Sequence, residues 1–290
     1  MNAGGPKRLP VSFFPHRRKY GTRGHPAQKL VWGSIMLERL HGSRKGMQDQ
    51  RKRWDEAFAE RDFFGPGASP FGQWALSRMR GLTPGTVLDL GTGQGRDALA
   101  FADHGLEVTA LDYSAPGLRQ LADEAERQGM SSMITTLQHD LNEPMPFPDE
   151  SFGAVYAHML LCMEFDAVQV SGVLAEVRRV LAPDGLFLFS VRTVQDAQCG
   201  MGRHIRETLY EIGGFAIRFF SREMVRACAG GGMAVEAMDH FQEGSAALDI
   251  FAACLRRTGA AWDPRAEVRL QEAFSEAHCD SGMLEGKGAG

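Results

Sequence analysis

The residues best suited to chemistry in this chain are three glycines and an aspartate in segment 87–95, which reads V-L-D-L-G-T-G-Q-G. The apolar start of this segment is typical of a strand, and the amphipathic stretch that follows, residues 96–104, is typical of a helix. Glycines in a turn between a strand and a helix let the backbone approach a ligand, and the helix start offers unpaired N–H groups. The segment therefore predicts a turn that binds a small ligand.

Two further aspartates stand where the next two strands should end. Asp112 closes the second predicted strand, where a carboxylate can accept hydrogen bonds from both hydroxyl groups of a ribose. Asp140 follows the third, where a carboxylate can accept a hydrogen bond from an adenine amino group. This spacing favours an adenosine-containing ligand. It speaks against a nicotinamide dehydrogenase, whose G-x-G-x-x-G motif would require glycine in place of Arg96.

From Thr86 onward, short β-branched or apolar runs alternate with helical patterns, as in βαβ units of a mostly parallel sheet. The apolar residues of segment 170–181 recur at helical spacing before Pro-Asp-Gly, and we expect this stripe to lie in the core. The predicted strands are Thr86–Leu90, Glu107–Asp112, Ile134–His139, Phe152–His158 and Leu186–Arg192, followed by a helix from about Ser221, strands from about Met233 to Phe241 and about Ala247 to Arg256, and a helix after Pro264.

These features together resemble the class I S-adenosylmethionine-dependent methyltransferases, and the similarity covers roughly residues 54–256. The same family pattern appears in segment 145–152, M-P-F-P-D-E-S-F, and in segment 177–186, V-R-R-V-L-A-P-D-G-L. Gly153 departs from it, because relatives usually place Asp after Ser-Phe; the departure concerns the local loop, not cofactor binding. The resemblance implies an α/β Rossmann-like fold, with a doubly wound, mostly parallel seven-stranded sheet, helices on both faces, and S-adenosyl-L-methionine as the cofactor.

The resemblance also implies a role for each residue of the cofactor site. The aspartates have an alternative interpretation as helix caps or surface strand ends. Their common position at the carboxyl ends of parallel strands, where such folds bind ligands, favours function. In the implied site Gly91, Gly93 and Gly95 face the methionine part of the cofactor, Asp89 holds its amino group, Asp112 binds the ribose, Tyr113 and Leu141 flank the adenine, and Asp140 lies at the adenine edge.

The family has no fixed catalytic residue, since the sulfonium of the cofactor already activates the methyl group. His158, at the end of the fourth predicted strand, is a candidate for orienting or deprotonating the acceptor, and a histidine satisfied by a backbone group is the alternative. Tyr210 is a second candidate catalytic residue, in segment 204–215, which suits either an active-site cover or an ordinary connecting hairpin.

Two glycines of this segment and two aromatic residues on the N-terminal side of the domain also have candidate roles. Gly213 and Gly214 would be the hinges of a cover. Trp54 and Phe58 either close the cofactor pocket or belong to an amphipathic helix that packs on the sheet.

Length and composition predict one catalytic domain. The chain has 290 residues, of which 43% are hydrophobic, and no apolar run is long enough for a membrane span or a secretory signal, so we expect a cytoplasmic protein. The five cysteines form no C-x-x-C pair, which argues against a disulfide framework or a metal site and predicts mostly reduced thiols. The expected divisions are a disordered basic arm, 1–46, the methyltransferase domain, 47–262, and a C-terminal helix with a flexible tail, 263–290. The arm has two other interpretations, as a targeting peptide or as sequence upstream of a start at Met47.

The charge distribution and two missing motifs favour a small-molecule acceptor. Residues 1–53 hold 13 Lys or Arg against two acids, so the rest of the chain is strongly acidic and would repel nucleic acid. After the fourth predicted strand there is no Asp/Asn-Pro-Pro-aromatic motif of base-amine methyltransferases, and no Pro-Cys pair. Two alternatives stay open: a cofactor-binding module that regulates a partner, and an RNA or protein methyltransferase recruited by the basic arm. The sequence sets no oligomeric state.

Overall fold

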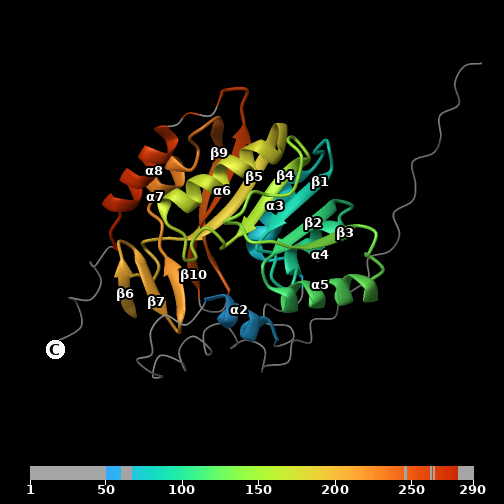
Figure 1. The fold of residues 1–290 in the computed structure, drawn as a ribbon, viewed down its shortest axis with the longest axis horizontal. Helices are drawn as coiled ribbons and strands as arrows, with labels where there is room; N and C mark the ends of the chain where they lie inside the picture. The colour runs from blue at the N-terminus through green and yellow to red at the C-terminus, as the bar shows by residue number, and fades with distance from the viewer. Residues whose placement is uncertain (1–49, 60–66, 245–246, 262, 264, 280–290) are drawn as a thin grey trace, which may run out of the picture.

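The computed structural model describes residues 50–59, 67–244, 247–261, 263 and 265–279. The predicted basic arm, 1–46, and the end of the predicted tail lie outside these residues. The main feature is one seven-stranded sheet in the order β3-β2-β1-β4-β5-β10-β9, in which β10 runs antiparallel to both of its neighbours (Figure 1). Its strands are β1 (Thr86–Leu90), β2 (Glu107–Asp112), β3 (Ile134–Gln138), β4 (Phe152–His158), β5 (Leu181–Arg192), β9 (Met233–Glu243) and β10 (Leu248–Arg257).

Helices cover both faces of this sheet, which confirms the doubly wound fold. One hydrophobic core contains Val170, Met224 and Leu270, one from each helix on the first face, and a second core contains Phe71, Ala98 and Leu121 from the helices on the other. The helices are α2 (Gln50–Ala59), α3 (Pro70–Met79), α4 (Arg96–Asp103), α5 (Ala115–Arg127), α6 (Ala167–Val180), α7 (Arg222–Ala227) and α8 (Arg265–Glu276). The first core includes α6, α7 and α8, and the second includes α3, α4 and α5.

Strand β5 begins five residues earlier than the sequence predicts. Leu181 already pairs with Phe152 of β4, and the register then shifts so that Ala154 pairs with Leu186. The segment between the two pairs holds Asp184, with a φ of 61°. The Pro-Asp-Gly segment does stop helix α6, as predicted, but it forms an irregularity inside the strand because main-chain pairing is already possible at Leu181.

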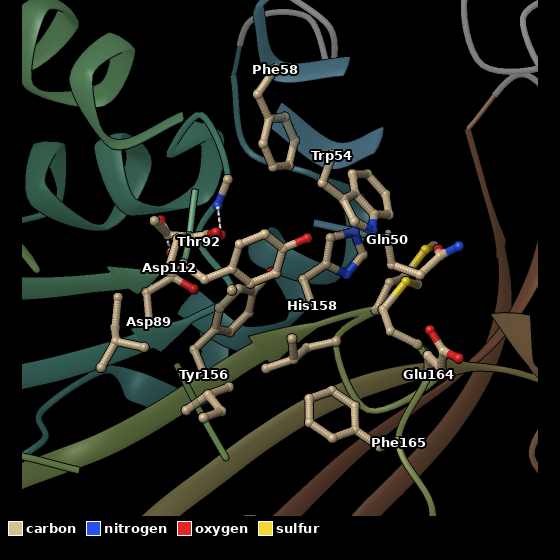
Figure 2. Close-up of a pocket in the computed structure, with 18 of the residues that line it drawn as sticks. Gln50, Trp54, Phe58, Asp89, Thr92, Asp112, Tyr156, His158, Glu164 and Phe165 are labelled. Atoms are coloured by element: carbon tan, nitrogen blue, oxygen red, sulfur yellow. Dashed lines mark hydrogen bonds between the residues drawn. The ribbon is translucent and has the colours of Figure 1, made fainter. Parts of the chain in front are cut away.

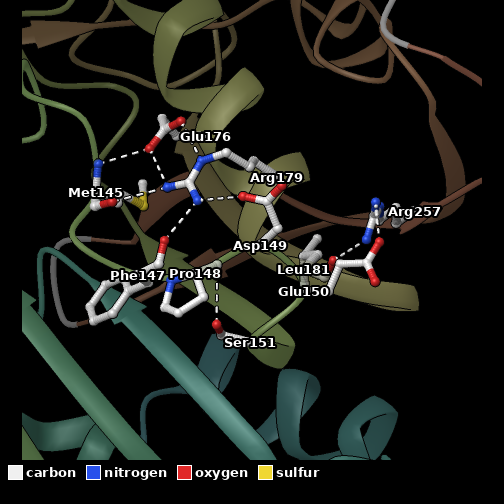
Figure 3. A network of polar contacts seen from close by, with 10 residues as sticks. All are labelled: Met145, Phe147, Pro148, Asp149, Glu150, Ser151, Glu176, Arg179, Leu181 and Arg257. Atoms are coloured by element: carbon white, nitrogen blue, oxygen red, sulfur yellow. Dashed lines mark hydrogen bonds and ion pairs between the residues drawn. The ribbon is translucent and has the colours of Figure 1, made fainter.

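The two segments that carry the family pattern are bound to each other by Arg179 of α6 (Figure 3). Its guanidinium donates to the carbonyl oxygens of Phe147 at 2.7 Å and Met145 at 3.0 Å, and pairs with Asp149 at 2.9 Å. Glu176, one turn earlier on α6, accepts from Arg179 at 2.7 Å and from the Met145 N–H at 2.8 Å. The hydrogen bond from Arg179 lowers the pKa of Glu176, so this contact favours its ionised form.

A small antiparallel sheet lies beside the large one and next to α2 (Figure 1). It consists of β6 (Arg203–Arg206), β7 (Leu209–Ile212) and β8 (Phe215–Arg218). Segment 204–215 is therefore two strands and their turns. Gly213 and Gly214, the predicted hinges, form the turn between β7 and β8, with φ values of 59° and 88°.

One cysteine prediction is wrong. Cys199 and Cys279 form a disulfide across 80 residues of sequence, because the chain after α8 returns to the connection between β5 and β6. The other three cysteines are buried free thiols, as expected. Burial raises the pKa of Cys162 to about 11 and those of Cys228 and Cys254 to about 12, so these thiols stay protonated at neutral pH. Within the described ranges, no helix has the length and apolar character needed to cross a bilayer.

Candidate active site

A cavity of about 300 Å³ opens at the carboxyl ends of β1, β2 and β4 (Figure 2). This is the edge at which parallel α/β sheets bind ligands. Eight of the ten predicted site residues line the cavity: Asp89, Gly91, Gly93, Asp112, Tyr113, Asp140, Leu141 and His158. Gly95 and Tyr210 are not among the lining residues.

The glycine turn between β1 and α4 forms one wall. The N–H groups of Gly91 and Thr92 donate to the carbonyl oxygen of Leu111 at 2.8 and 3.2 Å, which ties the turn to the end of β2. Gly91 has a φ of 68°, and a Cβ there would lie 2.8 Å from a Leu160 methyl group across the cavity. Glycine at this position therefore keeps open the space in which a ligand would lie against the backbone.

Gly95 has a different role from the one the sequence predicts. It precedes α4 with a φ of 77°, and a Cβ there would lie 2.2 Å from a methyl group of Leu121. Because the residue faces α5 and not the cavity, its glycine allows the two helices to approach each other. The third glycine of the motif thus serves packing, whereas the first two border the cavity.

Asp89 is buried at the bottom of the cavity. Its side chain is 3% exposed and accepts a hydrogen bond from the hydroxyl of Thr92 at 2.7 Å. Burial raises its pKa well above the usual range; the Thr92 hydrogen bond opposes this shift, and the nearby charges of Asp97 and Asp112 add to it. A cationic group bound at Asp89 would relieve that electrostatic cost, so the site fits an ammonium ligand.

Asp112, on the neighbouring strand, offers two oriented carboxylate oxygens. Its Oδ2 accepts from the Gly93 N–H and its Oδ1 from the Ser114 N–H, both at 2.8 Å. Burial raises the pKa of Asp112, while these two N–H groups lower it. Each oxygen retains a second lone pair, and a side-by-side pair of acceptors suits two adjacent hydroxyl groups such as those of a ribose.

At the third strand end, contacts within the chain already engage Asp140. Its Oδ1 accepts from the backbone and side-chain amides of Asn142 at 3.0 and 2.9 Å, and its other oxygen pairs with Arg51 of α2. The Arg51 guanidinium also lies over the Tyr113 ring, 5.5 Å from its centroid. An adenine amino group would have to share Asp140 with these donors.

Helix α2 forms the outer wall of the cavity, through Gln50, Arg51, Trp54 and Phe58. Trp54 stacks on Phe58 at 5.4 Å and contacts Phe215 of β8 at 4.6 Å between ring centroids. The two aromatic residues therefore line the cavity, and their helix packs on α5 and on β8 of the small sheet. No sequence pattern pointed to Gln50 and Arg51, which follow the basic arm in the sequence.

His158 belongs to a polar cluster that the sequence did not reveal. Its Nδ1 lies 2.7 Å from the hydroxyl of Ser190 on β5, and its Nε2 lies 3.1 Å from Oε1 of Glu243 on β9. Phe71 of α3 stacks on the imidazole at 5.3 Å. No motif could have predicted Glu243, because it lies 85 residues after His158 on a different strand and only the tertiary structure brings the two together at the cavity.

Asp97, at the start of α4, anchors the other side of this cluster. It accepts from the Ser69 N–H at 2.7 Å, the Ser69 hydroxyl at 2.9 Å and the Tyr156 hydroxyl at 2.7 Å. Burial acts to raise its pKa, but the charge of Arg96 and these hydrogen bonds act to lower it, and the net effect is a lowered pKa. Asp97 is therefore a buried, ionised residue that holds α3, α4 and β4 in place.

Tyr210 lies apart from the cavity, in the small sheet. Its ring packs against His204 at 5.0 Å and Phe219 at 6.2 Å between centroids. The structure does not bring it together with the other predicted site residues. Among the described residues there is also no group of three or more His, Cys, Asp or Glu that could hold a metal ion.

Comparison with known proteins finds a family model that matches part of this chain. Residues 87–185 match the family model described as "Methyltransferase domain". Sterol 24-C-methyltransferase ERG6B of Gibberella zeae is 39% identical over 116 residues, which cover 39% of this chain and 29% of that protein. Demethylmenaquinone methyltransferase of Tropheryma whipplei is 34% identical over 113 residues, which cover 38% of this chain and 44% of that protein. Each match spans less than half the length of the relative.

Solved structures show the same architecture. The CcbJ methyltransferase from Streptomyces caelestis superposes with a TM-score of 0.56 at 17% identity, covering 73% of this chain and 100% of that chain. The N-methyltransferase NodS from Bradyrhizobium japonicum, solved with S-adenosyl-L-homocysteine, gives 0.54 at 17% identity and covers 72% and 99%. At this identity the likeness concerns the fold alone. Residues 87–185 of this chain are therefore similar to a methyltransferase domain, and the chain has the Rossmann-like fold of class I methyltransferases.

Proposed function

We propose that this protein is an S-adenosylmethionine-dependent methyltransferase that acts on a small-molecule acceptor. The observation that carries the proposal is the pair of buried carboxylates at neighbouring strand ends, Asp89 and Asp112, on either side of a glycine turn that borders a cavity. The first suits an ammonium group and the second a ribose diol, and the cofactor contains both. The matched family and its named relatives support the same activity.

In this mechanism the residues of the chain mainly bind, orient and exclude water. When bound, the cofactor supplies an activated methyl group on a sulfonium. Asp89 would hold its amino group, Asp112 its ribose, and Gly91 and Gly93 its backbone-facing surface. Trp54 would cover the reacting region from α2, which limits access of water during an in-line displacement.

A small acceptor fits the site better than nucleic acid. Among the described residues that line the cavity, six carboxylates accompany two arginines, and this excess would repel a phosphate backbone. The relatives named above act, by their names, on a sterol and on demethylmenaquinone. The alternative of an RNA or protein acceptor depends on the basic arm, which lies outside the described residues.

The first test is calorimetric titration of the protein with S-adenosylmethionine and, separately, with NADH. We expect micromolar binding of the former and none of the latter.

Asp112→Ala should weaken the binding of S-adenosylhomocysteine by about 1–3 kcal/mol, the usual loss for a buried hydrogen-bonding group. Asp123→Ala, at an exposed position on α5, is the matched control and should bind as the wild type does. Equal affinities of the two variants would contradict the proposed role of Asp112.

A further inference from the structure

The cavity contains a buried carboxylate oxygen that has no hydrogen-bond partner within the described part of the chain. Glu243, the last residue of β9, is 5% exposed and lines the cavity beside His158. Its Oε1 lies 3.1 Å from His158 Nε2 and 3.6 Å from Arg96 Nη2, whereas Oε2 is buried and accepts no hydrogen bond. A buried acceptor left unpaired destabilises the protein, so a ligand that donates to Oε2 would be stabilised there.

The hydrogen bonds of His158 indicate that the imidazole orients Glu243. A carboxylate can only accept, so His158 Nε2 must carry the hydrogen of that contact. The hydroxyl of Ser190 accepts from the Met159 N–H at 3.0 Å and can donate its own hydrogen to His158 Nδ1 at 2.7 Å. Both ring nitrogens are then engaged. Glu243, and not His158, therefore offers the free acceptor atom in this cluster.

The acidic residues that line the cavity favour some methyl acceptors over others, according to the charge of the acceptor. Two of its six carboxylates, Asp89 and Asp112, are assigned to the cofactor, and the four that remain, Glu243 among them, outnumber the two arginines of the lining. This surplus of negative charge disfavours an anionic acceptor and favours one that is positively charged or donates hydrogen bonds. Much of the remaining lining is apolar and could hold the body of such a molecule: Trp54, Leu160, Met163, Phe165 and Leu248.

We propose that the methyl acceptor is an amine on an apolar body, and that Glu243 Oε2 binds its nitrogen and removes its proton. The proposal rests on the methyl-transfer function above. A protonated amine gives one proton to Oε2, which frees the nitrogen lone pair. That pair forms the N–C bond as the C–S bond breaks, and the C–S electrons remain on sulfur. The product leaves as an N-methylammonium ion, and Glu243 returns its proton to solvent.

The first experiment measures binding of matched probes to the protein saturated with S-adenosylhomocysteine. The probes are 2-phenylethylamine and tryptamine, and their carboxylate counterparts 3-phenylpropionate and 3-indolepropionate, titrated by ligand-observed NMR. We expect each amine to bind at least tenfold more tightly than its carboxylate. Equal binding within a pair, or no amine binding at millimolar concentration, would overturn the proposal.

The variants Glu243→Gln and Glu236→Gln test whether this preference comes from Glu243. Glutamine keeps the size of the side chain and removes its charge, so Glu243→Gln should abolish the tenfold preference for amines. Glu236 lies on the same strand, exposed and paired with Arg256, and its variant should keep the preference. A Glu243→Gln protein that binds amines as the wild type does would contradict the assignment.

Turnover tests the proton-transfer step. For an amine that the wild type methylates, Glu243→Gln should lower kcat by about 100-fold or more, the usual size of a general-base contribution, and Glu243→Asp should restore part of it. An unchanged kcat would overturn the proton role. S-adenosylhomocysteine binding is measured first on every protein. Its absence in the wild type contradicts the proposed function, whereas intact binding without an amine preference contradicts this inference alone.

Discussion

At the scale of single residues, the site contains buried carboxyl groups, and the hydrogen bonds that they accept within the chain offset only part of the electrostatic cost of their burial. Asp89 and Asp112 are both nearly inaccessible, and burial raises the pKa of each. Their raised pKa values mean that folding favours the protonated carboxyl, so ionisation of these groups opposes stability near neutral pH. Such a cost is acceptable where a ligand supplies the missing partner, as an ammonium group would at Asp89.

Cofactor binding should therefore release a proton from Asp89. The folded chain keeps this carboxyl protonated above the pKa of the unfolded chain, and that contribution to stability is lost as pH rises through the raised pKa. An ammonium ligand favours the ionised form, so affinity should increase with pH over the same interval. Calorimetry of S-adenosylhomocysteine binding in phosphate and in Tris buffer measures the released proton.

The variant Asp89→Asn should bind the ligand more weakly and without this proton release. It should also be more stable than the wild type near neutral pH, by about 1 kcal/mol, because asparagine is neutral in the unfolded chain too and needs no proton uptake on folding. Asp123→Asn on the surface of α5 serves as the control and should retain the wild-type proton release. Identical proton release in the wild type and Asp89→Asn would assign it to another group.

At the scale of elements, the glycine motif divides its roles between ligand space and packing. Gly91 borders the cavity, whereas Gly95 lets α4 and α5 approach. The family motifs of segments 145–152 and 177–186 have a structural role too, since Arg179 joins them (Figure 3). Conspicuous sequence motifs in this fold are therefore partly the consequence of helix and loop packing around the site.

Gly95→Ala should destabilise the fold. A Cβ there would contact Leu121 at 2.2 Å in a left-handed backbone conformation, so the strain and the overpacking add to about 2–4 kcal/mol. Gly129→Ala has a similar φ of 72° and open space around the Cβ, so it should cost only about 1 kcal/mol. Urea denaturation gives both values; equal losses would mean that α5 shifts to accept the methyl group.

Arg179→Ala should cost about 2 kcal/mol of unfolding free energy, because it leaves the carbonyl groups of Met145 and Phe147 without their charged donor. Arg127→Ala on the exposed side of α5 is the control and should change stability by less than about 0.5 kcal/mol. The same denaturation experiment measures both. A loss in Arg179→Ala no larger than in the control would show that the network contributes little.

At the scale of the whole molecule, elements distant in sequence close the site. Helix α2 precedes the sheet and forms the outer wall, and β9, the edge strand, contributes Glu243 (Figure 1). The small sheet supports α2, since Gln50 donates to Gly214 at 3.0 Å and accepts from the Ala216 N–H at 3.1 Å. A disulfide joins the chain after α8 to the segment before β6.

Removing that disulfide should lower stability without affecting the cofactor site. The bond closes a loop of 80 residues, for which chain entropy predicts about 4.5 kcal/mol as an upper value. We expect the Tm to fall when a reductant is added to the wild type and to be equally low in Cys279→Ser. Reductant should have no further effect on the variant. A Tm unaffected by reductant would show that the bond is absent in solution or contributes no stability.

From the amino-acid sequence alone we could predict the fold class, the five parallel strands to within five residues, and most of the residues that line the cavity. These depend on local patterns, since hydrophobic periodicity, turn glycines and strand-end aspartates act over short stretches of chain. The tertiary structure alone decided which residues meet across the sheet. It directed Gly95 toward α5, placed Tyr210 apart from the cavity, paired Cys199 with Cys279, and brought Glu243 to His158. These contacts depend on sheet order and on the return of the chain from distant elements, which no local pattern records.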